Sequence, residues 1–141
     1  MSPLKAIPLD DPRIAVRGAL HIERSADRLR FHRLPDWTRA QSPEPAFDLM
    51  AAMTSGVRLV FETTSRVLEV RALETGLQFA GEERRRATLE LVCGETRVSA
   101  DLTTGQTIVV DGAKVSFTPG VPGVARFDLP TGRKQVEVWL P

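Results

Sequence analysis

A run of alternating residues between positions 56 and 75 constrains the fold more than any other part of the sequence. Its first half, VRLVFE, has apolar residues at 57, 59 and 61, and its second half, VLEVRA, has them at 68, 70 and 72. A period of two places alternate side chains on opposite faces of a strand, so each half has one face suited to a core. The polar TTS at 63–65 is typical of a tight turn. The stretch therefore predicts two antiparallel strands joined as a hairpin.

The same period recurs along most of the chain, for example in RLRFHRL at 28–34, ATLELVC at 87–93 and VARFDL at 124–129. About ten short strands separated by turn signals at spacings of roughly 8–12 residues are typical of an all-β sandwich or barrel. One segment differs: AFDLMAAMT at 46–54 contains good helix formers and is followed closely by Gly56.

We therefore predict an all-β fold, an antiparallel two-sheet β-sandwich that is jelly-roll-like, with one short helical segment near 46–54. A single domain is expected over residues 13–141, after an N-terminal lead-in at 1–12. The predicted core consists of the inward positions Leu59, Phe61, Leu68, Val70, Leu89, Leu91, Phe127, Val136 and Val138.

Charge and cysteine content narrow the classes of function. The 141 residues include 19 basic and 18 acidic side chains, for a net charge of +1, and the two signs are mixed along the chain. No one-sided field points to nucleic acid or to a membrane surface, so neither is an expected partner. Cys93 is the single cysteine, which excludes an internal disulfide. No signal peptide or membrane helix is recognisable, so the expected location is the cytoplasm.

Catalytic motifs are missing from the sequence. It contains no G-x-S-x-G nucleophile elbow and no glycine-rich phosphate loop. The run Arg84-Arg85-Arg86 could bind a phosphate, but it follows Glu82 and Glu83, which favours a solvated loop. The sequence thus predicts no catalytic residue and no cofactor.

The two histidines give one geometric prediction. If Ala26-Asp27 is a two-residue hairpin loop, His21 and His32 lie directly opposite on the outward face of two paired strands. Two imidazoles at that distance can share a metal ion, but a zinc site needs three or four protein ligands, and Glu23 is the one candidate for a third. The pair is therefore a weak metal candidate, and a structural surface pair is favoured.

The two tryptophans are the candidate binding residues. Trp37 follows Pro35-Asp36, and could stack on a sugar or serve as a core or lid aromatic. In QVEVWL at 135–140 the apolar alternation places Trp139 on the outer face. We therefore expect its ring to be largely exposed and to belong to an aromatic platform or a domain interface.

The chain also resembles a known domain. DDPRIAVRGALHIERSADRLRFHRLP at 10–35, AAMTSGVRLVFETTSRVLEVRA at 51–72 and KQVEVWLP at 134–141 resemble, in order and pattern, the N-terminal β-sandwich of SGNH/GDSL-type esterases. In that family the sandwich is jelly-roll-like and precedes a hydrolase domain with Gly-Asp-Ser and Asp-x-x-His motifs. Neither motif occurs here, so no catalytic residue is carried over.

The resemblance implies a non-catalytic accessory domain that packs on a C-terminal SGNH-type hydrolase domain acting on acylated carbohydrate or small esters. Two alternatives stay open: an autonomous carbohydrate-binding sandwich that uses Trp37 or Trp139, and a ligand-free assembly module, which could form homo-oligomers. A concave face with tryptophan and polar groups favours carbohydrate binding, whereas a flat apolar patch favours docking or assembly.

Overall fold

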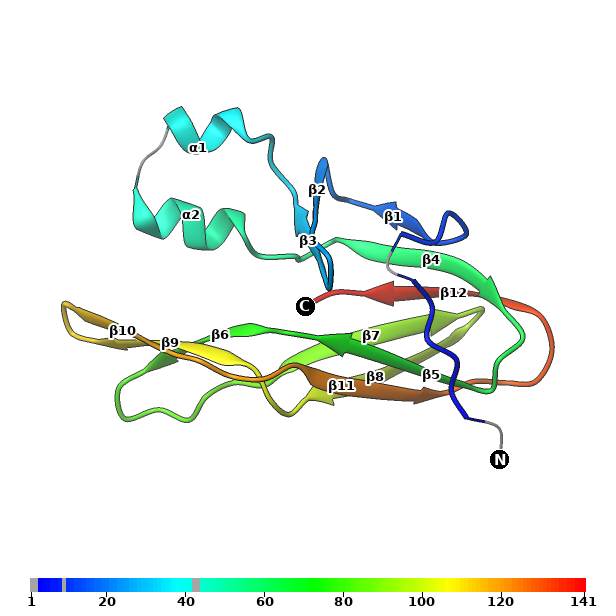
Figure 1. Cartoon of the computed structure of the whole chain (residues 1–141). Coiled ribbons are helices and arrows are strands. Elements are labelled where there is room, and N and C mark those ends of the chain that lie inside the picture. The colour runs from blue at the N-terminus through cyan, green and yellow to red at the C-terminus, as the bar shows by residue number, and fades with distance from the viewer. Residues whose placement is uncertain (1–2, 9, 42–43) are drawn as a thin grey trace.

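The chain is built mainly from short strands, as the computed structural model in Figure 1 shows for residues 3–8, 10–41 and 44–141. Positions 1, 2 and 9 of the predicted lead-in lie outside the described residues. The helices are α1 (Trp37–Gln41) and α2 (Pro45–Ala51). The strands are β1 (Ala15–Arg17), β2 (His21–Arg24), β3 (Leu29–His32), β4 (Arg58–Thr63), β5 (Val67–Ala72), β6 (Thr75–Phe79), β7 (Ala87–Cys93), β8 (Thr96–Leu102), β9 (Gln106–Asp111), β10 (Lys114–Thr118), β11 (Gly123–Asp128) and β12 (Lys134–Trp139).

Two layers of strands form a sandwich, which confirms the predicted fold class. One layer is a five-stranded antiparallel sheet in the order β1-β4-β12-β7-β8. The antiparallel pair β11-β5 packs against it, and the chain continues from β5 into the three-stranded sheet β10-β9-β6 (Figure 1).

The hydrophobic core lies between the five-stranded sheet and the β11-β5 pair. All nine residues predicted for the core belong to it. Five are buried, and they are Leu89, Leu91, Phe127, Val136 and Val138. The other four, which are Leu59, Phe61, Leu68 and Val70, are half-buried and pack against the buried cluster. Period-2 alternation therefore located the core correctly.

The predicted hairpin over residues 56–75 is wrong in its pairing. Both strands exist, as β4 and β5, but they lie in different sheets, and residues 64–66 carry the chain from one layer to the other. β4 pairs with β1 and β12, while β5 pairs with β11. The alternation is the same in either arrangement, because two strands that face one core from opposite sides need the same pattern as two neighbours in one sheet.

One strand pair departs from the antiparallel rule. β6 and β9 run parallel, with Leu77 opposite Ile108. Beside this pair Arg84 is half-buried: it forms an ion pair with Glu74, and its Nε donates to Thr107 Oγ1 at 2.8 Å. The expectation of a solvated arginine loop is therefore wrong for Arg84, which ties the start of β6 to β9.

A small cap lies over one end of the five-stranded sheet, and comprises the hairpin β2-β3 with α1 and α2 (Figure 1). The predicted helical segment is present as α2. α1 was not predicted; its first turn is fixed by Thr38, whose N–H and hydroxyl both donate to Pro35 O. Within the described part of the chain, neither helix has the length or apolarity needed to cross a membrane.

Candidate functional site

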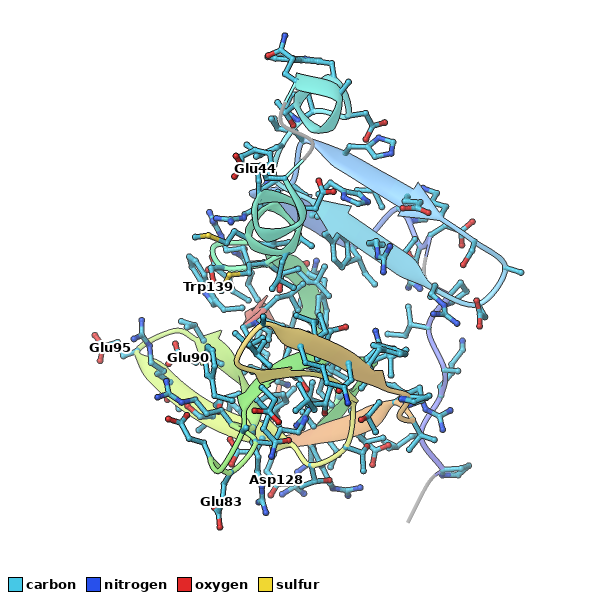
Figure 2. The ribbon with its side chains drawn as sticks, turned by 90° about the vertical axis from the view of Figure 1, so that its left-hand side faces the viewer. Glu44, Glu83, Glu90, Glu95, Asp128 and Trp139 are labelled. Carbon is cyan, nitrogen blue, oxygen red and sulfur yellow. The ribbon has the colours of Figure 1, made fainter. Side chains whose placement is uncertain are left out.

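Three of the four residues singled out in the sequence lie in the cap, and the fourth lies close to it. His21 and His32 are on the paired strands β2 and β3, and Trp37 begins α1. Trp139 ends β12, below α2 in the view of Figure 2. The cap is therefore the candidate site.

The two histidines lie directly opposite in the β2-β3 register, as predicted. Their ring centroids are 5.6 Å apart and the rings are tilted by 32°. Each imidazole also has a carboxylate neighbour: Glu23 Oε2 lies 3.1 Å from His32 Nε2, and Asp36 Oδ2 lies 3.9 Å from His21 Nε2. The result is a row of carboxylate, imidazole, imidazole and carboxylate along one face of the hairpin.

His32 does not point into water as predicted: it is 4% exposed. Helix α2 lies beside this strand, because a cleft of about 230 Å³ is lined by Arg30, Phe31 and His32 of β3 and by Asp48 and Ala52 from the α2 side. Just after β3, Arg33 donates to the carbonyl of Met50, which fixes the helix against the hairpin. This packing could not be predicted from strand alternation, because it brings together a strand and a helix, which alternation does not relate.

The described residues of the cap do not supply the ligands of a metal centre. Among the residues that the structure describes, no group of three or more His, Cys, Asp or Glu side chains could hold a metal ion. The cleft beside His32 is also smaller than the roughly 300–1,000 Å³ usual for small-molecule sites. The cleft is lined by two basic side chains, one carboxylate and the aromatic ring of Phe31. Such a lining suits contact with a polar surface or a small polar group.

Trp37 has an open ring. It is 62% exposed at the start of α1, beside Asp36, which reaches toward His21. The interpretation as a core aromatic is therefore wrong, and the ring is accessible to a ligand or a partner.

Trp139 is half-buried, so the prediction of a largely exposed ring is wrong. Its strand register is as predicted, since Val136 and Val138 are 0% exposed. The outer face is covered instead: Arg58, its partner in β4, places the guanidinium carbon 4.8 Å from the ring centroid. Trp139 Nε1 is buried and has no hydrogen-bond partner among the described residues.

The chain end after Trp139 is held against the segment that follows α2. The Leu140 N–H donates to Val57 O at 2.9 Å, and the Thr54 hydroxyl donates to Pro141 O at 2.8 Å. These bonds fix the end of β12 beneath the cap, so Trp139 lies where the cap and the sandwich meet.

Comparison with known proteins gives a likeness to a solved structure but none to a sequence family. No protein-family model matches the chain, and no curated protein sequence matches it. Among solved structures, the salicylyl-acyltransferase SsfX3 from a tetracycline biosynthetic pathway matches with a TM-score of 0.68 and 26% identity. The fold is shared with part of an acyltransferase.

The extent of this match differs between the two proteins. It covers 96% of this chain but 35% of the acyltransferase, so the chain spans about a third of that enzyme's length. The matched part of this chain includes the cap as well as the sandwich. A match over 96% of the chain leaves out too few residues to omit the two helices and the hairpin.

Proposed function

We propose that this chain is a non-catalytic accessory domain of an SGNH/GDSL-type hydrolase or acyltransferase, which packs on the catalytic domain and helps to shape it. The observation that carries the proposal is the match of nearly the whole chain to about a third of a salicylyl-acyltransferase. In enzymes with a serine nucleophile, ester hydrolysis and acyl transfer share one chemistry: the serine attacks an acyl carbonyl and forms an acyl-enzyme intermediate. An esterase of acylated carbohydrate or small esters and an acyltransferase can therefore use the same domain plan.

The sequence supports the non-catalytic role. It contains neither a Gly-Asp-Ser nor an Asp-x-x-His motif. An acyl-transfer enzyme needs a nucleophile and a base within hydrogen-bond reach, so both would come from the catalytic domain. The part played by this chain is then to bind and to position.

The cap offers the surface for that docking. Exposed large apolar side chains gather on α1, on α2 and just after it, and these are Trp37, Leu49, Met50 and Met53. Methionines adapt to a partner's shape, and an exposed Trp adds contact area, as is common at protein interfaces. The cleft beside His32 would lie at the edge of this contact.

The transcript that encodes the chain tests the proposal. We expect it to encode, in the same reading frame, a domain with Gly-Asp-Ser and Asp-x-x-His motifs. Purified alone, the chain should not hydrolyse p-nitrophenyl acetate above the buffer rate. A transcript without an acyl-transfer domain, or saturable hydrolysis by the chain that one Ser→Ala change abolishes, would contradict the proposal.

A second candidate, an autonomous carbohydrate-binding module, is favoured by one observation: the open Trp37 ring next to Asp36 and His21. A sugar would stack on the ring and hydrogen-bond to the carboxylate. A glycan array probed with the wild type and with Trp37→Ala tests it, with Leu49→Ala as the matched control. Binding that Trp37→Ala alone removes supports the module, and an array without binding excludes it.

A further inference from the structure

The three-stranded sheet β10-β9-β6 has one face that is wholly apolar in its two central rows. The strand registers place Leu77, Ile108 and Phe117 in one row. They place Phe79, Val110 and Val115 in the next. Four of these six side chains are exposed, and the exposed fractions are 40% for Leu77, 50% for Phe79, 66% for Val115 and 57% for Phe117. None of the six belongs to the core cluster or packs against it.

The opposite face of this sheet is the more polar one, and residues 82 and 84 cover part of it beside β6 and β9. Arg84 binds Thr107 there, and Gln78 Nε2 donates to Glu82 O at 2.9 Å. Residues alternate between the two faces of a strand, so the apolar rows point away from the 81–86 segment. This sheet thus presents its apolar side outward.

β10 is also an open edge. All five of its residues are exposed, and β9 is the strand paired with it among those described. Lys114 pairs with Asp111 across the two-residue loop Gly112-Ala113. In such a ladder the backbone groups of alternate residues point inward and outward, so those of Val115 and Phe117 face the free edge. An unpaired apolar edge of this kind is a template for another strand.

We propose that two copies of this chain associate by pairing β10 with β10 in antiparallel fashion, about a two-fold axis at Ser116. This register places Val115 opposite the partner's Phe117, and Ser116 opposite the partner's Ser116. The outward backbone groups of Val115 and Phe117 then exchange hydrogen bonds with those of the second copy. Both apolar rows continue without interruption from one copy into the other.

The second copy is favoured over other occupants because β10, with the sequence KVSFT, is self-complementary. Pairing about Ser116 sets Lys114 opposite the partner's Thr118, so no like charges meet. With a net charge of +1 per chain, two copies repel each other little. The two-fold arrangement uses both edges at once and closes as a dimer.

A single short strand buries little area, which sets the expected affinity. The contact falls at the low end of interface sizes, below about 1,200 Å², where weak and transient complexes are found. We therefore expect dimers at about 100 µM and monomers at about 1 µM in sedimentation velocity experiments.

Cysteine cross-linking tests the register. In a Cys93→Ala background, Ser116→Cys places two thiols on residues whose Cα atoms are about 4.5 Å apart in a non-hydrogen-bonded pair, within disulfide range. Lys114→Cys is the matched control on the same face of the same strand; its two copies would lie about 13 Å apart. Oxidation at about 100 µM should cross-link Ser116→Cys at least tenfold faster than Lys114→Cys.

Several outcomes would overturn the proposal. Equal rates for the two variants, or no cross-link at Ser116→Cys, would exclude this register. Faster cross-linking by Val115→Cys than by Ser116→Cys would mean that the apolar faces stack on each other instead. If the wild-type chain stays monomeric at about 100 µM, β10 does not pair with a second copy, and its partner would be a strand of a different protein.

A charge variant gives an independent test. Ser116→Lys sets two ammonium groups directly opposite in the dimer, while the side chain is exposed in the monomer and folding should be unaffected. We expect dimerisation at least tenfold weaker, with an unchanged circular dichroism spectrum. Ser99→Lys is the control, since Ser99 is exposed at the middle of the edge strand β8. Equal loss in both variants, or no loss in Ser116→Lys, would contradict edge pairing.

Discussion

At the residue scale, Trp37 and Trp139 differ in what covers their rings. Trp37 is 62% exposed on a short helix, whereas Trp139 lies under the guanidinium of Arg58 and has a buried indole nitrogen. A cation over an indole face adds roughly 0.5–2 kcal/mol to the packing of the ring. The two residues should therefore respond differently to the same substitution.

Trp139→Ala should lower the free energy of unfolding by about 2–3 kcal/mol, somewhat less than for a fully buried tryptophan. Trp37→Ala should change it by less than about 0.5 kcal/mol, as is usual at exposed positions. Urea unfolding followed by circular dichroism measures both. A Trp139→Ala variant as stable as Trp37→Ala would show that the covered Trp139 ring does not contribute to stability.

Two glycines with nearly the same backbone conformation make a second matched pair. Gly18 has φ +83° and Gly132 has φ +88°, both in the left-handed region. A Cβ at Gly18 would collide with the carbonyl oxygen of Gly56, whereas a Cβ at Gly132 would meet no atom of the described residues within 4 Å. Gly18 is thus needed for a close approach of two backbone segments as well as for its dihedral angle.

Gly132→Ala should cost about 1 kcal/mol, the strain of a left-handed alanine. Gly18→Ala should cost at least 2 kcal/mol, because the backbone must also move apart. Thermal and urea unfolding of the two variants separate these effects. Equal losses would mean that the contact between residues 18 and 56 does not contribute to stability.

At the scale of elements, the parallel pair β6-β9 depends on one side chain outside both strands. Arg84 pairs with Glu74 and binds Thr107, and its guanidinium also lies against Gly76. The side chains of Arg84 and Glu74 are 19% and 12% exposed, so removal of one partner leaves a mostly buried charge.

Arg84→Ala should therefore lower the free energy of unfolding by about 2 kcal/mol, less than the 3–5 kcal/mol of a fully buried pair. Amide hydrogen exchange should rise in β6 and β9 before it rises in β12. Arg85→Ala, at an exposed neighbouring position, is the control and should have little effect. An equal change in the free energy of unfolding for the two variants would show that Arg84 does not hold β6 against β9.

The strands could be predicted from the sequence, but their partners could not. Alternation is local, so it identified β4, β5, β7, β11 and β12 and the core residues on them. Pairing is not local. β4 lies between β1 and β12, and Arg58 of β4 is paired with Trp139 of β12, which lies 81 positions later in the sequence. The covering of Trp139 and the burial of His32 both follow from such distant contacts, and for that reason both were predicted incorrectly. The His21–His32 pairing was predicted correctly because a two-residue turn makes it local.

At the scale of the whole molecule, the chain combines a stable sandwich with two surfaces of different character. The core cluster joins the five-stranded sheet to β5 and β11. The cap exposes Trp37 and the two methionines, and the β10-β9-β6 sheet exposes an apolar face and an open edge. The proposed roles divide accordingly: the cap docks a catalytic domain, and β10 joins two copies.

The central claim, membership of an acyl-transfer enzyme, is tested most directly in cells of the source organism. An antibody raised against residues 13–141 would be used to precipitate the native protein after treatment with a biotinylated fluorophosphonate, which reacts with activated serines. Because this chain has no such serine motif, label can enter the precipitate only through a catalytic domain. The account predicts one labelled polypeptide much larger than 141 residues, with the modified serine in a Gly-Asp-Ser sequence. An unlabelled precipitate, made up of a protein of 141 residues alone, would contradict it.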